Sequence, residues 1–297
     1  MSILTKFRRL LNEPPPLYAV EISHGGVAWW RRARKGAETG YHPLEPGSLT
    51  INPLRDNVVR PDELLECARK LAAQDGRNKR RTAALILPDY STRVAVLDFD
   101  SLPSRREEQL ALVRYRMKKS IPFDVESAHV SFYAQPSGGG RKYEVVAAIC
   151  ALEIVARYEA AFRSAGFEPG FVTTSTLAAL NLVPEDGVTV LAKLSGGVLT
   201  AAVIQDRNLR LLRCLELPEV APDEVNRVLY PTFAFCEDTY GARPERMVLC
   251  GFDEMGGIVG EQARRDFGVE VDRLRSKRGE PGAANVGLLG YLEAAGE

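Results

Sequence analysis

Several features are missing from this sequence of 297 residues, and their absence narrows its function. It has no apolar run of the roughly 18 residues needed to span a bilayer, and no apolar core typical of a signal peptide. Lysine and arginine together number 39, as do aspartate and glutamate, so the bulk charge gives no indication of nucleic-acid binding. We therefore expect a cytoplasmic protein that binds no nucleic acid.

Cysteine and histidine are few and scattered. The histidines have no metal-ligand spacing to each other or to a cysteine, and no two cysteines lie close enough to hold zinc. We expect no metal site, and we expect the cysteines to be buried free thiols of a reducing compartment. The residues concerned are Cys67, Cys150, Cys214, Cys236, Cys250, His24, His42 and His129.

Motifs of the common enzyme classes are also missing. The sequence contains no nucleophile elbow, P-loop or dinucleotide-binding fingerprint. Adjacent carboxylates such as Glu107 and Glu108 are better explained as the acidic start of a helix. We therefore expect no catalytic residue, and the residues alone give no independent indication of an enzyme.

An internal repeat is the main architectural feature that is present. Residues 17–22 and 27–30 form two strand-like segments around a turn containing Gly25 and Gly26. Residues 188–194 and 198–205 repeat this pattern around Gly196 and Gly197, and a third strand-like segment follows at 209–215. The repeat predicts two lobes of similar α/β architecture.

Residues 102–124 contain a helix of distinctive composition. Ser104 and Glu107 have the spacing of a capping box, and Leu110, Val113 and Met117 recur at helical spacing. The Ile-Pro-Phe segment at 121–123 ends the helix, because the residue before a proline avoids the helical region. From the pattern alone, this is a surface helix packed on a small sheet.

The order of strand, Leu-Pro, Glu-rich helix start and Ile-Pro-Phe resembles the inserted subdomain of PilM-type proteins. These are actin-like cytoplasmic components of the type IV pilus inner-membrane assembly platform. The resemblance implies a bilobed actin-like (ribonuclease H-like) α/β fold with an inserted small α+β subdomain. It divides the chain into an N-terminal arm (1–16), a first lobe (17–182) with the insert at about 89–165, and a second lobe (183–297). A closing helix at about 283–294 is expected to pack back toward the lobe interface.

The resemblance also implies ATP with magnesium, bound at the two hairpin turns, but the motifs differ from the family pattern. In the first turn Glu21 replaces an Asp, Ser23 a Gly and His24 a hydroxyl residue, before Gly25. The alternative is a plain hairpin. Either ATP with magnesium or no cofactor is compatible with these residues.

In the second turn Lys193 stands where the family has the Asp that organises the metal and the attacking water. A charged lysine cannot ligate magnesium or act as a base, although it can pair with a phosphate. Ser195, Gly196 and Gly197 follow, and Gly251 retains part of a Gly-rich turn beside the adenosine. The resemblance therefore implies a vestigial nucleotide site with weakened or lost binding, and a pseudo-ATPase.

The partner implied by the resemblance is the cytoplasmic tail of a PilN-type inner-membrane protein, docked near the insert. Its expected surface consists of Arg114, Met117, Lys118, Ile121, Pro122 and Phe123. Other platform or motor components, self-association and an indirect, peripheral association with the cytoplasmic face of the inner membrane are further expectations.

Three alternatives remain open. One is an ATP-hydrolysing switch in the same machine, with Glu21 in place of the usual Asp. Another is the cytoplasmic actin-like component of a type II secretion platform. For the N-terminal arm, Phe7 and its apolar neighbours opposite Arg8 have the composition of a weak membrane anchor. The other interpretation is a frayed terminus or a contact with the body of the protein.

Overall fold

The computed structural model describes residues 16–33, 36–73, 81–121, 123–136, 143–184, 186–241 and 243–296. The chain divides into two compact units. The first consists of Met1–Ser91, Glu153–Leu182 and Leu274–Glu297, and the second of Thr92–Leu152 and Val183–Arg273. Apart from Pro16, the expected N-terminal arm lies outside the described residues.

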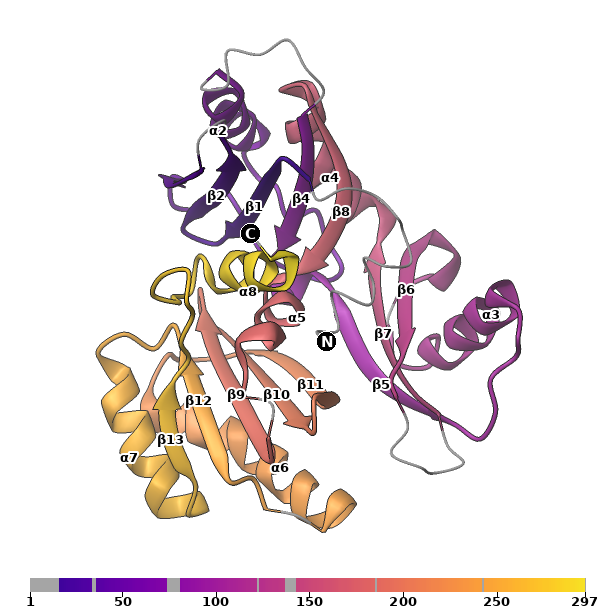
Figure 1. Ribbon diagram of the computed structural model, residues 1–297, viewed down its shortest axis with the longest axis vertical. Helices are drawn as coiled ribbons and strands as arrows, with labels where there is room; N and C mark the ends of the chain where they lie inside the picture. The colour runs from indigo at the N-terminus through magenta and orange to yellow at the C-terminus, as the bar shows by residue number, and fades with distance from the viewer. Residues whose placement is uncertain are drawn as a thin grey trace. The chain divides into compact units, whose positions relative to one another are not determined.

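The first unit is built on a sheet with the strand order β3-β2-β1-β4-β8 (Figure 1). Strands β1, β2 and β3 pair antiparallel, whereas β4 pairs parallel with both β1 and β8. The strands are β1 (Tyr18–Ser23), β2 (Gly26–Arg32), β3 (Ala37–Pro43), β4 (Arg81–Leu87) and β8 (Phe167–Thr174). Strand β3 is absent from the sequence prediction, because its Gly, His and Pro residues have little strand propensity.

Helices complete this unit. They are α2 (Pro61–Ala73), α4 (Leu152–Ser164), the short α5 (Ser175–Ala179) and α8 (Val286–Ala295). Alternate strand residues such as Ala19 and Ile86 pack with Leu288 and Tyr291 of α8. Because successive side chains of a strand point to opposite faces, Glu21 lies on the same face as Ala19, toward α8. The insert was predicted to extend to residue 165, whereas residues 153–164 of α4 group with the first unit.

The second unit contains a sheet with the same design. Its strand order is β11-β10-β9-β12-β13, with the first three strands antiparallel and β12 parallel to both β9 and β13. The strands are β9 (Val188–Ser195), β10 (Val198–Gln205), β11 (Asn208–Glu216), β12 (Arg246–Cys250) and β13 (Glu270–Arg273). The repeat predicted from the sequence is therefore confirmed.

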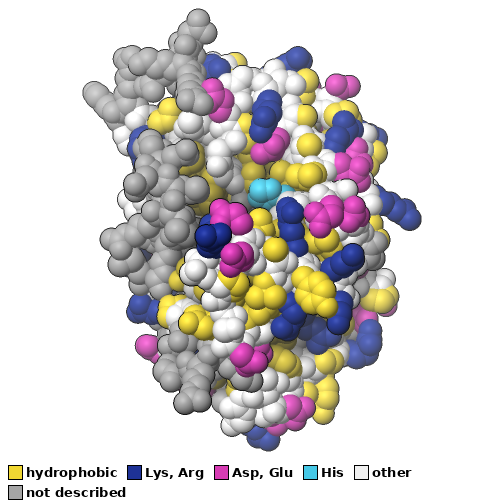
Figure 2. Space-filling model, turned by 90° about the vertical axis from the view of Figure 1, so that its right-hand side faces the viewer, with side chains coloured by type: hydrophobic (Ala, Val, Ile, Leu, Met, Phe, Trp, Pro, Cys, Tyr) yellow, Lys and Arg dark blue, Asp and Glu magenta, His cyan; other side chains and the backbone are white. Residues whose placement is uncertain are grey.

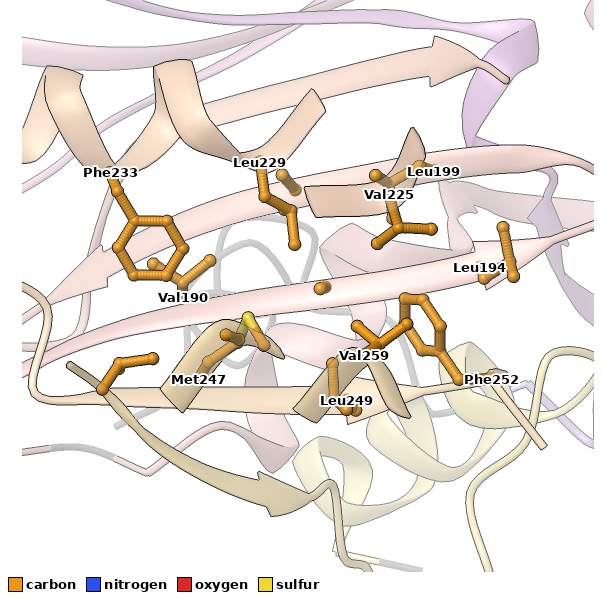
Figure 3. Close-up of a cluster of buried hydrophobic side chains, with 14 of the residues drawn as sticks. Val190, Leu194, Leu199, Val225, Leu229, Phe233, Met247, Leu249, Phe252 and Val259 are labelled. Atoms are coloured by element: carbon orange, nitrogen blue, oxygen red, sulfur yellow. The ribbon is translucent and has the colours of Figure 1, made fainter. Parts of the chain in front are cut away.

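Helices α6 (Pro222–Tyr240) and α7 (Met255–Phe267) cover one face of this second sheet. Figure 3 shows Leu229 and Phe233 of α6 facing Val190 and Met247 of the strands. The rings of Phe233 and Phe267 stack with their centroids 4.1 Å apart. This core leaves the opposite sheet face, which carries Lys193, pointing away from α6 and α7.

The insert is a three-stranded sheet, β5-β7-β6, covered by α3 (Arg106–Met117). Its strands are β5 (Arg93–Phe99), β6 (Ala128–Ala134) and β7 (Tyr143–Ala151). Val113 and Met117 of α3 are buried against Phe132 and Val145. The predicted capping box is wrong: Arg105 is the N-cap residue, and its side chain makes no capping hydrogen bond.

Two expectations about the whole chain can be compared with the structure. All five cysteines are buried and none of them forms a disulfide, as expected. Within the described ranges, no helix is long and apolar enough to cross a bilayer.

Candidate functional site

The residues predicted for a vestigial nucleotide site fall in both units, and the first group forms the β1–β2 turn. Ser23 pairs with Gly26 across a two-residue turn formed by His24 and Gly25, both exposed. The Ser23 hydroxyl donates to the Gly26 carbonyl at 2.9 Å, which closes the turn. Ser23 therefore has a structural function within the hairpin.

Tyr41 of β3 lies against the glycines of this turn. A Cβ atom added at Gly26 would meet the Tyr41 hydroxyl at 2.5 Å, and one at Gly25 would meet it at 3.3 Å. Burial raises the pKa of Tyr41, and a hydrogen bond with Ser23 partly offsets this increase. Gly26 is thus required by the close approach of Tyr41 and of the His42 carbonyl oxygen, at 2.5 Å each, whereas a Cβ at Gly25 would meet only the end of the Tyr41 side chain.

Glu21 is a buried carboxylate with two protein donors. Its side chain is 1% exposed. Oε1 accepts a hydrogen bond from the Ser175 hydroxyl at 2.5 Å, and Oε2 accepts one from the Leu288 amide at 2.7 Å. Since Leu288 lies in the first turn of α8, the carboxylate satisfies one of the amides that a helix start leaves unpaired.

The helices around Glu21 pack unusually closely. A Cβ added at Gly287 would lie 2.7 Å from the Ser175 Cα, and one at Gly290 would lie 2.3 Å from the Ala178 carbonyl oxygen. These two glycines allow α8 to approach α5 closely. Glu21 is therefore held in place by the N-terminal ends of two tightly packed helices, α5 and α8.

The second turn joins β9 to β10. Gly196 and Gly197 both adopt positive φ, at 57° and 82°. Two consecutive residues of positive φ define a type I′ turn, whose twist suits a two-residue hairpin. The Gly197 carbonyl accepts a hydrogen bond from the Leu217 amide at 2.9 Å. These glycines are thus required by the hairpin conformation, and Ser195 ends the preceding strand.

Lys193 is buried in the centre of β9, with 3% of its surface exposed. Across the sheet it is in register with Thr200 on β10 and with Cys250 on β12. Thr200 is in turn 3.3 Å from the sulfur of Cys214 on β11. The strand neighbours of Lys193 thus provide hydroxyl and thiol groups, and the row contains no carboxylate.

A magnesium–ATP site of the expected kind does not fit these residues. Both oxygens of Glu21 accept hydrogen bonds from protein donors, and Lys193 carries an ammonium where a carboxylate ligand is needed. No group of His, Cys, Asp or Glu in the described part of the chain could hold a metal ion. Gly251 has φ of 76° and allows the chain to turn after β12.

The predicted partner surface is located on the insert, in the second unit. Lys118 is exposed, and Arg114 is partly exposed with its guanidinium 3.5 Å from Glu126. Ile121 and Phe123 are half-buried against the insert core. Met117 is fully buried, so it shapes the helix from inside and is not part of the accessible surface. Pro122 lies outside the described residues.

Figure 2 shows the face of the molecule on which α3 and β6 lie. Lysine and arginine side chains are mixed there with hydrophobic and acidic ones. The exposed apolar residues of the insert include Tyr115, with 65% of its surface accessible. Such a mixed surface suits a peptide with both apolar and polar groups.

Sequence reasoning did not identify Tyr41, Ser175 or Leu288 as neighbours of the first turn. Ser175 and Leu288 lie 154 and 267 positions away from Glu21 in the sequence. One available indication was the run of small residues from Ala283 to Gly290, which predicts close contact without naming the contacted group.

Comparison with known proteins supports the fold. No family model matches the sequence, and no curated protein sequence matches it. Among solved structures, the chain is similar to a PilM-PilN type IV pilus biogenesis complex, with 17% identity, 95% of this chain and 99% of that chain covered, and a TM-score of 0.71.

Two further structures extend the comparison. The cytoplasmic domain of EpsL, an inner-membrane component of the Vibrio cholerae type II secretion system, is 12% identical, with 94% of each chain covered and a TM-score of 0.51. A Bacteroides thetaiotaomicron protein with an actin-like ATPase fold is 10% identical, with 92% and 94% covered and a TM-score of 0.55. The expected actin-like α/β fold is therefore confirmed.

Proposed function

We propose that this protein is a cytoplasmic scaffold of a type IV pilus inner-membrane assembly platform, and that it binds the cytoplasmic tail of a PilN-type membrane protein. The observation that carries this proposal is the likeness to the PilM-PilN complex over 95% of this chain and 99% of that chain. The peripheral location at the inner membrane, and contacts with other platform or motor components, belong to the same proposal.

The second part of the proposal is that nucleotide binding is weakened or lost. It is supported by the two charged residues of the opening strands. Glu21 accepts hydrogen bonds from Ser175 and from the start of α8, so a metal would compete with these two donors for the carboxylate. Lys193 has no carboxylate among its strand neighbours. A protein of this kind stays folded and binds its partner without ATP.

Titration calorimetry tests both parts in one sample. We expect no heat of binding with ATP and magnesium, and binding of a synthetic peptide that covers the partner's cytoplasmic tail at about 1 μM, equivalent to about 8 kcal/mol. Tight nucleotide binding would contradict the second part and favour the ATP-driven switch. A peptide that fails to bind would contradict the first part.

Variants of the insert locate the peptide site. Lys118→Glu reverses an exposed charge of the predicted surface, and Phe123→Ala removes a half-buried apolar contact. We expect each to weaken peptide binding about tenfold, or about 1.4 kcal/mol. Lys277→Glu is the matched control, because it reverses an exposed charge in the other unit. Equal effects of Lys118→Glu and Lys277→Glu would indicate a general charge effect.

Lys193→Asp tests the loss of hydrolysis directly. We expect no ATP hydrolysis by the unaltered protein. Hydrolysis that appears only in the variant would support lost catalysis, because a carboxylate restores the group that a metal and a water molecule need. ATP hydrolysis by the unaltered protein would refute the proposed loss of hydrolysis, whether or not the variant folds.

The type II secretion alternative rests on the likeness to EpsL, which has the lower TM-score of 0.51. Both platforms use an actin-like component, so the partner decides between them. Binding of a tail peptide from a type II secretion membrane protein, with no binding of the PilN-type tail, would favour this alternative.

A further inference from the structure

A glutamine side chain connects the insert to the second-lobe sheet. Gln135 directly follows β6, and only 4% of its surface is exposed. Its Nε2 donates to the Leu209 carbonyl at 2.8 Å, and its Oε1 accepts from the Leu209 amide at 2.8 Å. Both backbone groups of one residue of β11 are therefore paired with one side chain.

This pairing completes the outer edge of a sheet. Strand β11 is the last strand of its sheet, so β10 pairs with one side of it and the other side has no strand of that sheet. The amide of Gln135 supplies a donor and an acceptor together, as the peptide group of a neighbouring strand would. Because Leu209 is fully buried, loss of this amide would leave an unpaired donor and acceptor in the interior.

The backbone fixes the position of Gln135 from the insert side. Its own amide donates to the Glu144 carbonyl of β7 at 2.8 Å, which continues the pairing of β6 with β7. Glu144 also forms an ion pair with Arg210, the residue after Leu209. The backbone of Gln135 is thus paired with β7, and its partner Leu209 lies within β11.

Two further contacts surround this pair. The Arg210 guanidinium lies over the Tyr240 ring at 5.5 Å from its centroid, and Asn208 Nδ2 donates to the Pro136 carbonyl at 3.3 Å. The β10–β11 turn immediately before Asn208 has positive φ at Asp206 and Arg207, 49° and 66°. Non-glycine residues seldom adopt this conformation, and surrounding contacts are needed to maintain it.

We propose that Gln135 is a clamp that fastens the insert to the second-lobe sheet, so that the two open and move as one body. This contact does not follow from proximity along the sequence, since 74 positions separate Gln135 from Leu209. The consequence for the proposed function is that a partner seated on the insert is coupled to β11. Only that consequence rests on the proposed function.

Amide hydrogen exchange measured by NMR tests the clamp without any partner. In Gln135→Ala we expect the Leu209 amide to exchange at least about tenfold faster than in the unaltered protein, or about 1.4 kcal/mol less protection. Gln109→Ala is the matched control, because Gln109 Nε2 donates to the Pro103 carbonyl at 2.7 Å within the insert itself. It should leave Leu209 protected. Equal protection of Leu209 in Gln135→Ala and the unaltered protein would overturn the proposal.

Exchange in increasing urea tests the single body and does not depend on the Ala variant folding. In the unaltered protein, the amides of Val146 in the insert and Val203 in β10 should reach a common opening free energy. In Gln135→Glu, which keeps the acceptor and loses the donor, Val146 should open first. Independent opening of the two amides in the unaltered protein would overturn the clamp.

Titration with the partner's tail peptide then separates this proposal from the proposed function. A bound peptide should change the Leu209 resonance in the unaltered protein and leave it unchanged in Gln135→Ala. A peptide that does not bind contradicts the proposed function, whereas the exchange results decide the clamp by themselves. Binding without any change at β11 in the unaltered protein would overturn the coupling.

Discussion

The opening hairpins of the two units occupy the same position in identical strand orders, yet their glycines are required for different reasons. In the β1–β2 turn a side chain is excluded by space, because the Tyr41 hydroxyl lies 2.5 Å from where a Gly26 Cβ would be. In the β9–β10 turn Gly196 and Gly197 are required by positive φ, and the nearest atom to a Gly197 Cβ is 3.9 Å away. A glycine at a family motif position is therefore no evidence for a phosphate.

The charged residues of β1 and β9 also have different surroundings. Glu21 accepts hydrogen bonds from an α8 amide and from Ser175, so its charge contributes to helix packing. Lys193 lies in a row of hydroxyl and thiol side chains across its sheet. The comparison indicates that each unit has a buried ionisable residue on the first strand of its hairpin, and that the two residues have different environments.

The largest expected effect comes from removing the carboxylate of the first unit. Glu21→Ala leaves the Leu288 amide and the Ser175 hydroxyl without their partner, and we expect a loss of about 3 kcal/mol or more in the free energy of unfolding. Urea denaturation measures it. Glu38→Ala removes an exposed ion pair with Arg31 and should cost less than about 1 kcal/mol. Similar values for the two variants would show that Glu21 is not a structural cap.

The second effect tests the helix that Glu21 caps. Gly290→Ala would place a methyl group 2.3 Å from the Ala178 carbonyl oxygen, and we expect a loss of about 1–3 kcal/mol in denaturation experiments. Gly257→Ala is the control within a helix, since nothing lies within 4 Å of its Cβ position. It should stabilise the protein by about 0.5–1 kcal/mol. Tolerance of Gly290→Ala would mean that α8 packs less closely on α5.

The third effect separates the two turns. Gly197→Ala forces an alanine into positive φ and should cost about 1–2 kcal/mol. Gly25→Ala meets only the flexible end of Tyr41 at 3.3 Å and should change stability by less than about 0.5 kcal/mol. Thermal unfolding of both variants gives the comparison. Equal losses would contradict the conformational requirement at Gly197.

The last effect concerns pH. Burial raises the pKa of Cys150 and of Cys236 from 9.0 to about 11. Above the unfolded pKa the unfolded chain releases thiol protons that the folded chain retains, so stability should decrease as pH rises from 9.0 toward about 11.

The thiol contribution can be isolated by comparison with a variant. Urea midpoints at about pH 8 and about pH 10 should fall less in the Cys150→Ala, Cys236→Ala double variant than in the unaltered protein. Since tyrosines and lysines titrate in the same range, the difference between the two proteins is the relevant quantity. An identical decrease in both would show that these thiols do not contribute.

Much of the fold could be predicted because it is encoded locally. The largely apolar segment 198–205 matches β10, and the apolar spacing after Pro222 matches α6, which continues through Pro231. The same local reasoning failed at Ser104, because a capping box needs a particular backbone geometry that spacing does not specify. It also wrongly placed Met117 on the partner-binding surface, because helical periodicity alone does not show which side of a short helix is buried.

The environment of the candidate site could not be predicted in this way. Glu21 could be identified as a replaced family position, but its donors come from segments distant in sequence. Likewise, nothing near Gln135 in the sequence indicates that its amide pairs with Leu209. Such contacts depend on which strand edges and helix ends meet in three dimensions, and local sequence patterns do not specify these meetings.

The hydrogen bond between the Leu288 amide and Glu21 spans 267 positions, and it has a consequence for synthesis on the ribosome. Strand β1 emerges early, whereas α8 emerges after every other described helix and strand. Until then the first sheet lacks the helix that covers Ala19 and Ile86, and its carboxylate faces an incomplete interior. Completion of the first unit must therefore wait for the last helix, and a nascent chain stalled before residue 286 would be a target for chaperones and proteases.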